Sequence, residues 1–418
     1  MDEESFVNNI DNYTSSLVQE LSMTQYPNQP LKPYSVDWKS VVKTIYEYDD
    51  FGPELDKTGY FEDDINALIK GLNTQEEKIA AIFNYVKSSV KWNDYYGYSC
   101  NDGVKKAYKD KTGNVAEINL MLTAMLRYAG INANPVLLST RANGVALFPN
   151  RTAFDYVIAA VEIQDGLILL DATEKYSLPN VLPLRDLNWF GRLIRKDRTS
   201  VEVDLMPKTL SKEIINTSFV INSNGVITGK VRKQLTDHEA LYFRQKNIIT
   251  SKDNYLEELE NKNNAIEITD YVRENDLNLA KPILETYTFK DSKDFESING
   301  KIYIAPLLFL STKVNPFKQE VRAYPIDFGY PIENKYNIMI EIPEGYAVES
   351  LPVSMNIATP DNIGTYKYII GATGNKIQIS ITSDINTAIV PADYYTALKE
   401  FFQKMIDKQN EKIVLKKV

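Results

Sequence analysis

The sequence contains one cysteine, Cys100, and one histidine, His238, so thiol and imidazole chemistry have a single candidate each. A reactive thiol needs a helix N-terminus or a neighbouring base to lower its pKa, and the turn-like segment around Cys100 offers neither. His238 lies at the start of an expected helix far along the chain, where we expect a solvated surface position. A lone cysteine excludes an internal disulfide and a multi-cysteine metal site, and we predict neither a bound metal nor a cofactor.

Amide, carboxylate and phenol groups remain, and several of them lie at the ends of expected elements. Asn114 opens an apolar helix expected over residues 114–128, and Glu117 follows in the position of a capping box. This helix is apolar on most sides, so we expect it to be central and buried. Tyr156 begins an expected strand, and Asp171 follows the strand that returns after a hairpin turn at residues 164–166.

The order of these segments resembles a transglutaminase-like core, a papain-like cysteine fold. The family's Gly-Asp-Cys before an apolar helix reads here as Gly113-Asn114-Val115, and its helix exit Gly-Ile-Pro-Ala reads as Gly130-Ile131-Asn132-Ala133. The family's histidine begins a strand, at the position of Tyr156. Its acid ends a later strand in Asp-Pro-Thr or Asp-Ala-Thr, and here the segment is Asp171-Ala172-Thr173.

The resemblance implies that Val115, Tyr156 and Asp171 occupy the three catalytic positions and that only the acid keeps its family identity. Valine cannot act as a nucleophile, and a tyrosine with an ordinary pKa of about 10 is a poor general base at neutral pH. We therefore predict that acyl-enzyme formation is lost. Tyr156 can also be an ordinary strand tyrosine, and Asp171 either orients Tyr156 or Asn114 or only caps the following turn.

The candidate ligand-binding residues of this inherited site are Asn114, Glu117, Trp92, Tyr156 and Asp171. Trp92 and the aromatic pair at residues 95–96 could form a platform for a sugar or a peptide, although aromatic residues after a helix more often pack internally. The capping-box position of Glu117 already explains that residue.

A chain of 418 residues exceeds what one hydrophobic core usually serves, so we expect two or three domains. We assign residues 1–60 to a lead-in that could be the remnant of an N-terminal β domain, residues 61–200 to the transglutaminase-like domain and residues 201–418 to a β-rich domain. A capping box at residues 74–77 predicts a helix at residues 74–91. Short β-rich runs with turns, including Asn224-Gly225, predict a β-sandwich-like C-terminal domain, and the fold class is α+β.

The net charge of −9, with basic residues scattered apart from a short tail at residues 412–417, disfavours binding to nucleic acid. No apolar run is long enough to span a bilayer, and the acidic N-terminus lacks the layout of a secretory signal. The segment order resembles multidomain envelope proteins of Gram-negative bacteria, in which a transglutaminase-like domain lies between β-rich domains of unknown function. That resemblance implies a periplasmic or cell-envelope location.

Three functions are consistent with these patterns. The first is a noncatalytic transglutaminase-like protein that acts as a scaffold or binding module for peptide, glycan or an envelope partner. The second is a hydrolase that uses Asp171 with Glu117 or Tyr156 as acid and base, which requires their pKa values to be driven apart. The third is a purely structural module of a larger secreted protein.

Overall fold

The computed structural model describes residues 4–15, 21, 23–33, 37–222 and 225–418. The chain folds into two compact units, an N-terminal unit of residues 8–207 and a C-terminal unit of residues 208–418 that also takes in the residues before 8. Residues 8–60 fall within the N-terminal unit. Helix α1 (Trp38–Glu47) contributes to the core of this unit, because it buries Val41, Val42 and Ile45 completely.

The N-terminal unit contains five α-helices, short 3-10 turns and nine strands among its described residues. Its helices are α1 (Trp38–Glu47), α2 (Glu62–Leu68), α3 (Gln75–Ser89), α4 (Val104–Asp110) and α5 (Val115–Tyr128). Its strands are β1 (Met23–Thr24), β2 (Lys32–Pro33), β3 (Lys91–Trp92), β4 (Thr112–Gly113), β5 (Ala133–Leu138), β6 (Tyr156–Ile163), β7 (Gly166–Leu170), β8 (Phe190–Ile194) and β9 (Ser200–Asp204). Its 3-10 turns are η1 (Ile10–Tyr13), η2 (Pro53–Asp56), η3 (Arg151–Ala153) and η4 (Leu184–Asp186).

Helix α5 is the centre of this unit, as its apolar sequence predicts. Every residue from Val115 to Leu126 is buried. The helix packs on β5 and β6 of an antiparallel sheet with strand order β7-β6-β5-β8-β9, and α3 and α4 lie against it. The capping box expected for α3 is present, because the Thr74 hydroxyl accepts from the Glu77 amide at 3.1 Å and the Glu77 carboxylate accepts from the Thr74 amide at 3.0 Å.

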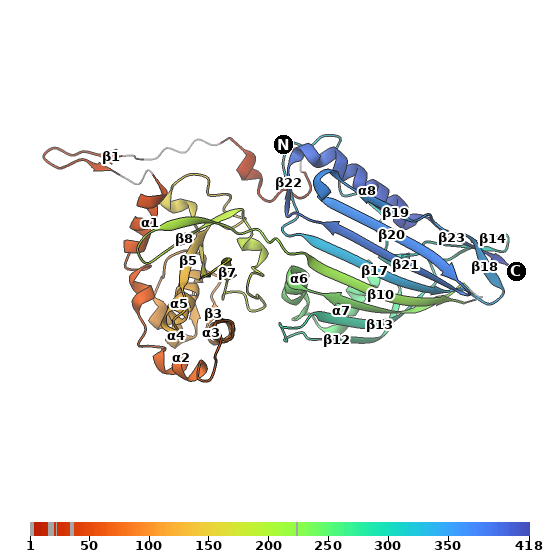
Figure 1. The fold of residues 1–418 in the computed structure, drawn as a ribbon, viewed down its shortest axis with the longest axis horizontal. Coiled ribbons are helices and arrows are strands. Elements are labelled where there is room, and N and C mark those ends of the chain that lie inside the picture. The colour runs from red at the N-terminus through yellow and green to blue at the C-terminus, as the bar shows by residue number, and fades with distance from the viewer. Residues whose placement is uncertain (1–3, 16–20, 22, 34–36, 223–224) are drawn as a thin grey trace. The chain divides into compact units, whose positions relative to one another are not determined.

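The C-terminal unit contains long strands, which Figure 1 draws in green to blue, and three α-helices. Its helices are α6 (Asp237–Asn247), α7 (Lys252–Lys262) and α8 (Tyr395–Asn410). Its strands are β10 (Ser211–Ile221), β11 (Ile227–Leu235), β12 (Glu267–Glu274), β13 (Ile283–Asp291), β14 (Glu296–Ile298), β15 (Lys301–Ile304), β16 (Ile326–Asp327), β17 (Ile332–Glu341), β18 (Tyr346–Ser350), β19 (Met355–Ala358), β20 (Gly364–Thr373), β21 (Lys376–Ile385), β22 (Ile389–Val390) and β23 (Ile413–Lys417). Its 3-10 turns are η5 (Leu308–Leu310), η6 (Pro360–Asn362) and η7 (Ala392–Tyr394).

An eight-stranded sheet with the order β12-β13-β11-β10-β17-β21-β20-β19 dominates this unit. Its pairs are antiparallel except β10 with β17, which is parallel. A four-stranded sheet, β14-β15-β23-β18, contributes Ile302, Ile304, Ile413 and Leu415 to the same core as the large sheet and the three helices. The protein is therefore α+β, with a β-rich C-terminal region.

The hairpin expected near residue 225 joins β10 to β11, with Ile221 opposite Ile227. Gly225 adopts a φ of 82°, the left-handed conformation that favours glycine, whereas Asn224 lies outside the described residues. No helix within the described part of the chain is both long and apolar enough to cross a membrane.

Candidate functional site

The N-terminus of α5 is closed by its own capping box. The Asn114 side chain accepts from the Glu117 amide at 2.8 Å, and the Glu117 carboxylate accepts from the Asn114 amide at 2.8 Å. Val115 is completely buried, and its amide donates to the Tyr95 carbonyl at 3.2 Å. Because these amides already have partners, this helix end keeps few free donors for an anion or an oxyanion.

Asn114 and Glu117 also hold the preceding loop. Glu117 Oε1 accepts from the amides of Asp102 at 2.6 Å and Gly103 at 3.0 Å, and Asn114 Nδ2 donates to the Ser99 carbonyl at 2.8 Å. Both side chains are almost fully buried. The predicted ligand-binding residues Asn114 and Glu117 therefore have structural partners for each hydrogen-bonding group described here.

Tyr156 and Asp171 meet at the place that the sequence predicts for a base and its acid. Tyr156 opens β6 and Asp171 follows β7, the neighbouring antiparallel strand. The phenol donates to Asp171 Oδ2 at 3.0 Å, and both side chains are 0% exposed. Burial first, and the negative charge of Asp171 second, raise the pKa of Tyr156 well above its ordinary value.

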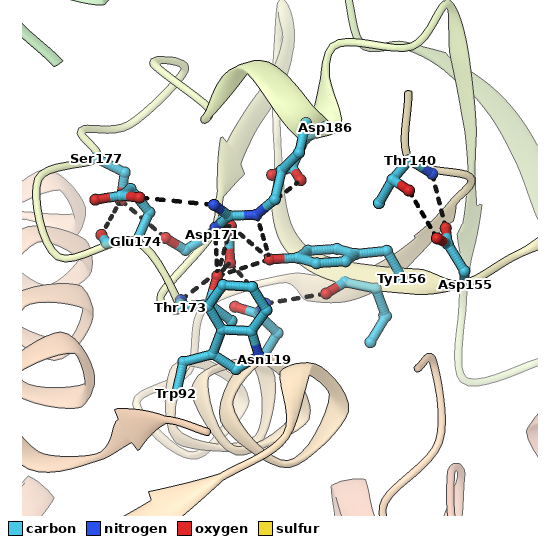
Figure 2. Close-up of polar contacts among 12 residues, drawn as sticks. Trp92, Asn119, Thr140, Asp155, Tyr156, Asp171, Thr173, Glu174, Ser177 and Asp186 are labelled. Atoms are coloured by element: carbon cyan, nitrogen blue, oxygen red, sulfur yellow. Dashed lines mark hydrogen bonds and ion pairs between the residues drawn. The ribbon is translucent and has the colours of Figure 1, made fainter. Parts of the chain in front are cut away.

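Asn119 links this pair to helix α5. It lies one helical turn after Val115, on the same side of the helix. Its Nδ2 donates to Asp171 Oδ1 at 2.9 Å and to the Val157 carbonyl at 3.0 Å, while its Oδ1 accepts from the Ala172 amide at 2.9 Å. Figure 2 shows Asn119, Tyr156 and Thr173 grouped around Asp171. The first turns of α5, the start of β6 and the end of β7 therefore come together, as the resemblance implies.

Arg185, in the turn η4 (Leu184–Asp186), fills the space beside this pair. Its Nε donates to the Tyr156 phenol oxygen at 3.1 Å, and its Nη2 donates to Asp171 Oδ2 at 3.1 Å and to the Thr173 hydroxyl at 2.8 Å. Its guanidinium lies 4.8 Å from the ring centroid of Trp92 and 5.7 Å from that of Tyr156. Arg185 thus interacts with the phenol, the acid and the indole at once.

Asp171 accepts several hydrogen bonds from within the protein. Besides its contacts with Tyr156, Asn119 and Arg185, its Oδ1 accepts from the Thr173 amide at 3.0 Å, and the Thr173 hydroxyl lies 2.8 Å from each carboxylate oxygen. A carboxylate that is completely buried and accepts this many hydrogen bonds serves as an anchor.

A second carboxyl group, Asp186, is buried beside the first. It is 0% exposed, and neither of its oxygens has a hydrogen-bond partner among the described residues. Its nearest cation is Arg185, whose Nε lies 3.8 Å from Asp186 Oδ1. Burial first, and the charge of Asp171 second, raise the pKa of Asp186 well above its ordinary value.

Trp92, predicted as part of an aromatic platform, makes internal contacts. Its indole N–H donates to the Tyr95 carbonyl at 3.1 Å, its ring packs edge-on against Tyr96 at 5.3 Å, and it lies against Arg185. Tyr95 and Tyr96 are exposed, at 64% and 46%. The Tyr96 ring also lies 5.7 Å from the Tyr156 ring, so Tyr96 packs against the phenol of the pair.

The remaining thiol and imidazole lie elsewhere. Cys100 is a free, buried cysteine, and burial together with the nearby carboxylates raises the pKa of its thiol well above the ordinary value. The prediction that His238 is a solvated surface residue is wrong. It is 3% exposed, stacks on Tyr330 with ring centroids 4.7 Å apart, and its Nδ1 lies 3.2 Å from the Ser211 hydroxyl. Tyr330, just before β17, supplies a neighbour that the local sequence does not reveal.

Sequence reasoning missed four residues of the cluster: Asn119, Thr173, Arg185 and Asp186. Asn119 had a usable signal, because an amide within an apolar helix must find partners when it is buried. Thr173 was visible as part of the Asp-Ala-Thr segment. Arg185 and Asp186 lie in a short turn that no periodicity or motif marks.

Two parts of the chain match known protein families, and the first of them includes most of this cluster. Residues 64–171 form a transglutaminase-like superfamily domain. Residues 300–415 match a domain of unknown function, DUF3858, that has a solved structure. The transglutaminase-like match spans Val115, Tyr156 and Asp171 and ends at that acid, so Arg185 lies beyond it.

Solved structures support the same fold. A crystal structure described as that of "a putative protease" from Parabacteroides distasonis matches with a TM-score of 0.53 and 13% identity over 92% of this chain. This chain spans 59% of the length of that protein. The comparison with curated proteins gives no match. Within the described residues, no group of three or more histidine, cysteine, aspartate or glutamate side chains could hold a metal ion.

Proposed function

We propose that this protein is a noncatalytic transglutaminase-like protein, a pseudoenzyme that acts as a scaffold or binding module for a peptide, a glycan or an envelope partner. The observation that carries the proposal is the position of Arg185, which donates to both Tyr156 and Asp171. In this arrangement the inherited acid serves to hold two strands and a turn together and does not orient a base.

The chain lacks a nucleophile at the helix end. Val115 has no nucleophilic atom, and covalent acyl transfer requires one. Cys100 does not replace it, because a buried thiol with a raised pKa is protonated at neutral pH.

The chain also lacks a base there. A phenol that donates its proton to Asp171 and accepts from Arg185 cannot accept a proton at neutral pH, and burial raises its pKa further. The three positions of the inherited triad therefore supply neither a nucleophile nor a general base.

The hydrolase alternative needs two carboxyl groups facing one substrate. Glu117 contacts the amides of Asn114, Asp102 and Gly103. The hydrogen-bond partners of Asp171 are Asn119, Tyr156, Thr173 and Arg185. The two carboxylates share no hydrogen-bond partner described here, and both are buried, which favours the noncatalytic reading.

The test is amide turnover by the purified chain. Incorporation of a fluorescent primary amine into casein and hydrolysis of a labelled casein should both stay at the level of a buffer blank, for wild type and for Cys100→Ala alike. Turnover that persists in Cys100→Ala and disappears in Asp171→Asn would refute the proposal and support the acid–base hydrolase.

A binding role and a purely structural role are separated in the parent protein. Deleting this region and measuring retention on immobilised peptides and glycans should weaken binding if the region is a binding module and leave it unchanged if it only joins neighbouring parts. We further infer an envelope location from the similarity in domain order. Fractionation of cells expressing the native gene tests it, and recovery in the cytoplasm would overturn it.

A further inference from the structure

One face of the eight-stranded sheet packs on the core, and the other is open. Alternate residues of β10 show the division, because Ile215 and Phe219 are buried while Asn216 and Ser218 are exposed. The helices α6, α7 and α8 and the strands β15 and β23 all contribute to the core on the buried side. The open face is hollowed into a trough of about 1150 Å³, which we call the sheet trough.

Polar side chains cross the sheet trough in a row. The strand registers place Arg232, Asn216, Asn337 and Ser380 side by side on β11, β10, β17 and β21. Asn337 Nδ2 donates to Asn216 Oδ1 at 2.9 Å, and the Ser380 hydroxyl lies 3.4 Å from Asn337 Oδ1. The amides are thus oriented by one another, and the Asn216 Nδ2 group faces the trough without a hydrogen bond among the described residues.

A second row lies two residues further along each strand. It consists of Lys230, Ser218, Met339 and Gln378, in the same strand order. The side chains of Lys230, Ser218 and Gln378 make no hydrogen bond or ion pair to any other described residue. The two rows therefore offer unused donors and acceptors on adjacent strands.

The charge of the sheet trough differs from that of the chain. The chain carries a net charge of −9, yet the trough is lined by the cations Lys230, Arg232 and Lys376 and by the carboxylate Glu274, with Glu341 opposite Lys376 in an adjoining hollow. Arg232 and Lys230 have no ion-pair partner among the described residues and lie on the same face of β11, two residues apart. An anionic ligand would supply the missing partner for both.

We propose that the sheet trough binds a linear acidic polysaccharide, with Arg232 and Lys230 on its carboxylates and the amide and hydroxyl rows on its sugar hydroxyls. A peptide fits less well. The backbone N–H and C=O groups of the central strands are hydrogen-bonded to the neighbouring strands, so a peptide cannot add to the sheet as a further strand there. The trough also has only two exposed large apolar side chains, Met339 and Ile369, to act as anchors. The proposal rests on the binding role proposed above and is independent of the loss of catalysis.

The test measures binding of the full chain to sodium polygalacturonate by isothermal titration calorimetry, with neutral dextran and poly-glutamate as comparison polymers. We expect binding to polygalacturonate alone, weakening as salt is raised because exposed charge pairs are screened. Absence of binding, equal binding to dextran, or tighter binding to poly-glutamate would each overturn the proposal.

Two variants locate the site. Lys230→Gln combined with Arg232→Gln should weaken binding at least about tenfold. Lys105→Gln combined with Lys109→Gln, which removes two exposed lysines from the other unit, should leave it unchanged. Equal losses in both pairs would mean nonspecific charge attraction and would overturn the proposal.

A third variant guards against a folding artefact. Ser218→Glu places a carboxylate at an exposed position inside the sheet trough, where it should repel the polymer and abolish binding without disturbing the core. Far-ultraviolet circular dichroism should match wild type. Retained binding in a folded Ser218→Glu protein would overturn the proposal. The amide-turnover assay does not depend on this result, so either hypothesis can fail alone.

Discussion

The phenol of Tyr156 donates to Asp171 Oδ2 over 3.0 Å, in the place where the family's histidine would meet its acid. The β6–β7 hairpin brings the two residues together. Its register pairs Ala159 with Leu170, so Tyr156 at the start of β6 and Asp171 just after β7 lie at the same end of the hairpin. Arg185 donates to the same phenol oxygen, and the Thr173 hydroxyl lies 2.7 Å from it. The strand pair therefore brings a phenol and a carboxylate into direct hydrogen-bonding contact, with Arg185 bound to both.

Replacing Arg185 by leucine should destabilise the N-terminal unit by about 3–5 kcal/mol, because Asp171 and Asp186 would be left buried beside no cation. Urea unfolding followed by tryptophan fluorescence measures this unit alone, since the three tryptophans of the chain are Trp38, Trp92 and Trp189.

The matched control is Arg198→Leu, which removes an arginine that is half exposed and pairs with the similarly exposed Glu47 at 3.4 Å. It should change the free energy of unfolding by less than about 1 kcal/mol. If Arg185→Leu were as mild as this control, Arg185 would be a ligand-facing residue of an open site and the closed-site interpretation would be wrong.

Asp186→Asn should become more stable than wild type as the pH rises. The folded-state pKa of Asp186 lies above its unfolded value, so the folded protein binds the extra proton and its stability falls as the pH rises from about 4 through the folded pKa. An asparagine has no proton to lose, so the advantage of Asp186→Asn in urea unfolding should be larger at pH 8 than at pH 5.

Asp197→Asn should show the opposite pH dependence of stability relative to wild type. Hydrogen bonds from Thr199 lower the pKa of Asp197, so its ionised form stabilises the folded protein once the pH exceeds the ordinary value. Asp197→Asn should become less stable relative to wild type as the pH rises toward the ordinary aspartate pKa of about 4.

For Asp186→Asn, a stability difference from wild type that does not change with pH would show that Asp186 is ionised in the folded protein.

Local sequence signals were sufficient for the elements that carry the site. Asn114 and Glu117 predict the start of α5, and the apolar run after them predicts its burial, because caps and periodicity act within a few residues. The positions of Val115, Tyr156 and Asp171 then follow from the order of the segments. Helix and strand ends that form through local hydrogen bonds are thus predictable.

The contacts that decide the chemistry are not local. Arg185 reaches Tyr156 from a turn 29 residues further along the chain, and His238 is buried by Tyr330 from a distant segment. The two rows of the sheet trough likewise depend on the parallel pairing of β10 with β17, which brings Asn216 beside Asn337. Alternation predicts which side chains share a face of one strand, and only the fold determines the neighbouring strand.

Gly229→Ala should destabilise the C-terminal unit by about 1–3 kcal/mol. A Cβ atom at Gly229 would lie 2.6 Å from Phe219 Cβ, Phe289 Cε1 and the Ser218 carbonyl oxygen, so the core side of the sheet would have to shift. Gly371→Ala, on β20, meets no atom within 4 Å and should be neutral. Urea unfolding followed by circular dichroism should show the lower stability. Tryptophan fluorescence should not, because all three tryptophans lie in the N-terminal unit. Equal effects of the two substitutions would contradict the packing of β11 described here.

Lys87 should make the N-terminal unit more stable as the pH rises above 8. Burial lowers the pKa of Lys87 to about 8, although its ammonium donates to the Ser177 carbonyl and Glu174 lies near. The unfolded chain therefore binds more protons between about pH 8 and pH 10.5, and the free energy of unfolding rises by up to about 3 kcal/mol across that interval. Lys87→Met should lack this rise in tryptophan-monitored urea unfolding, whereas Lys105→Met, at an exposed site, should keep it. A parallel rise in Lys87→Met would assign the pH dependence to another group.

A thiol installed at the helix end should remain unreactive while the protein is folded. Val115→Cys, made together with Cys100→Ala, places the thiol at a position that is 0% exposed, and Tyr156 donates its own proton in a hydrogen bond to Asp171 and so offers no base. Alkylation by iodoacetamide, followed by mass spectrometry, should be at least about a hundredfold slower than for Ser88→Cys in the same background, since Ser88 is exposed on α3. Urea should remove the difference. Rapid labelling of the folded Val115→Cys protein would mean that solvent reaches the start of α5, and the inherited cleft would then have to be treated as open.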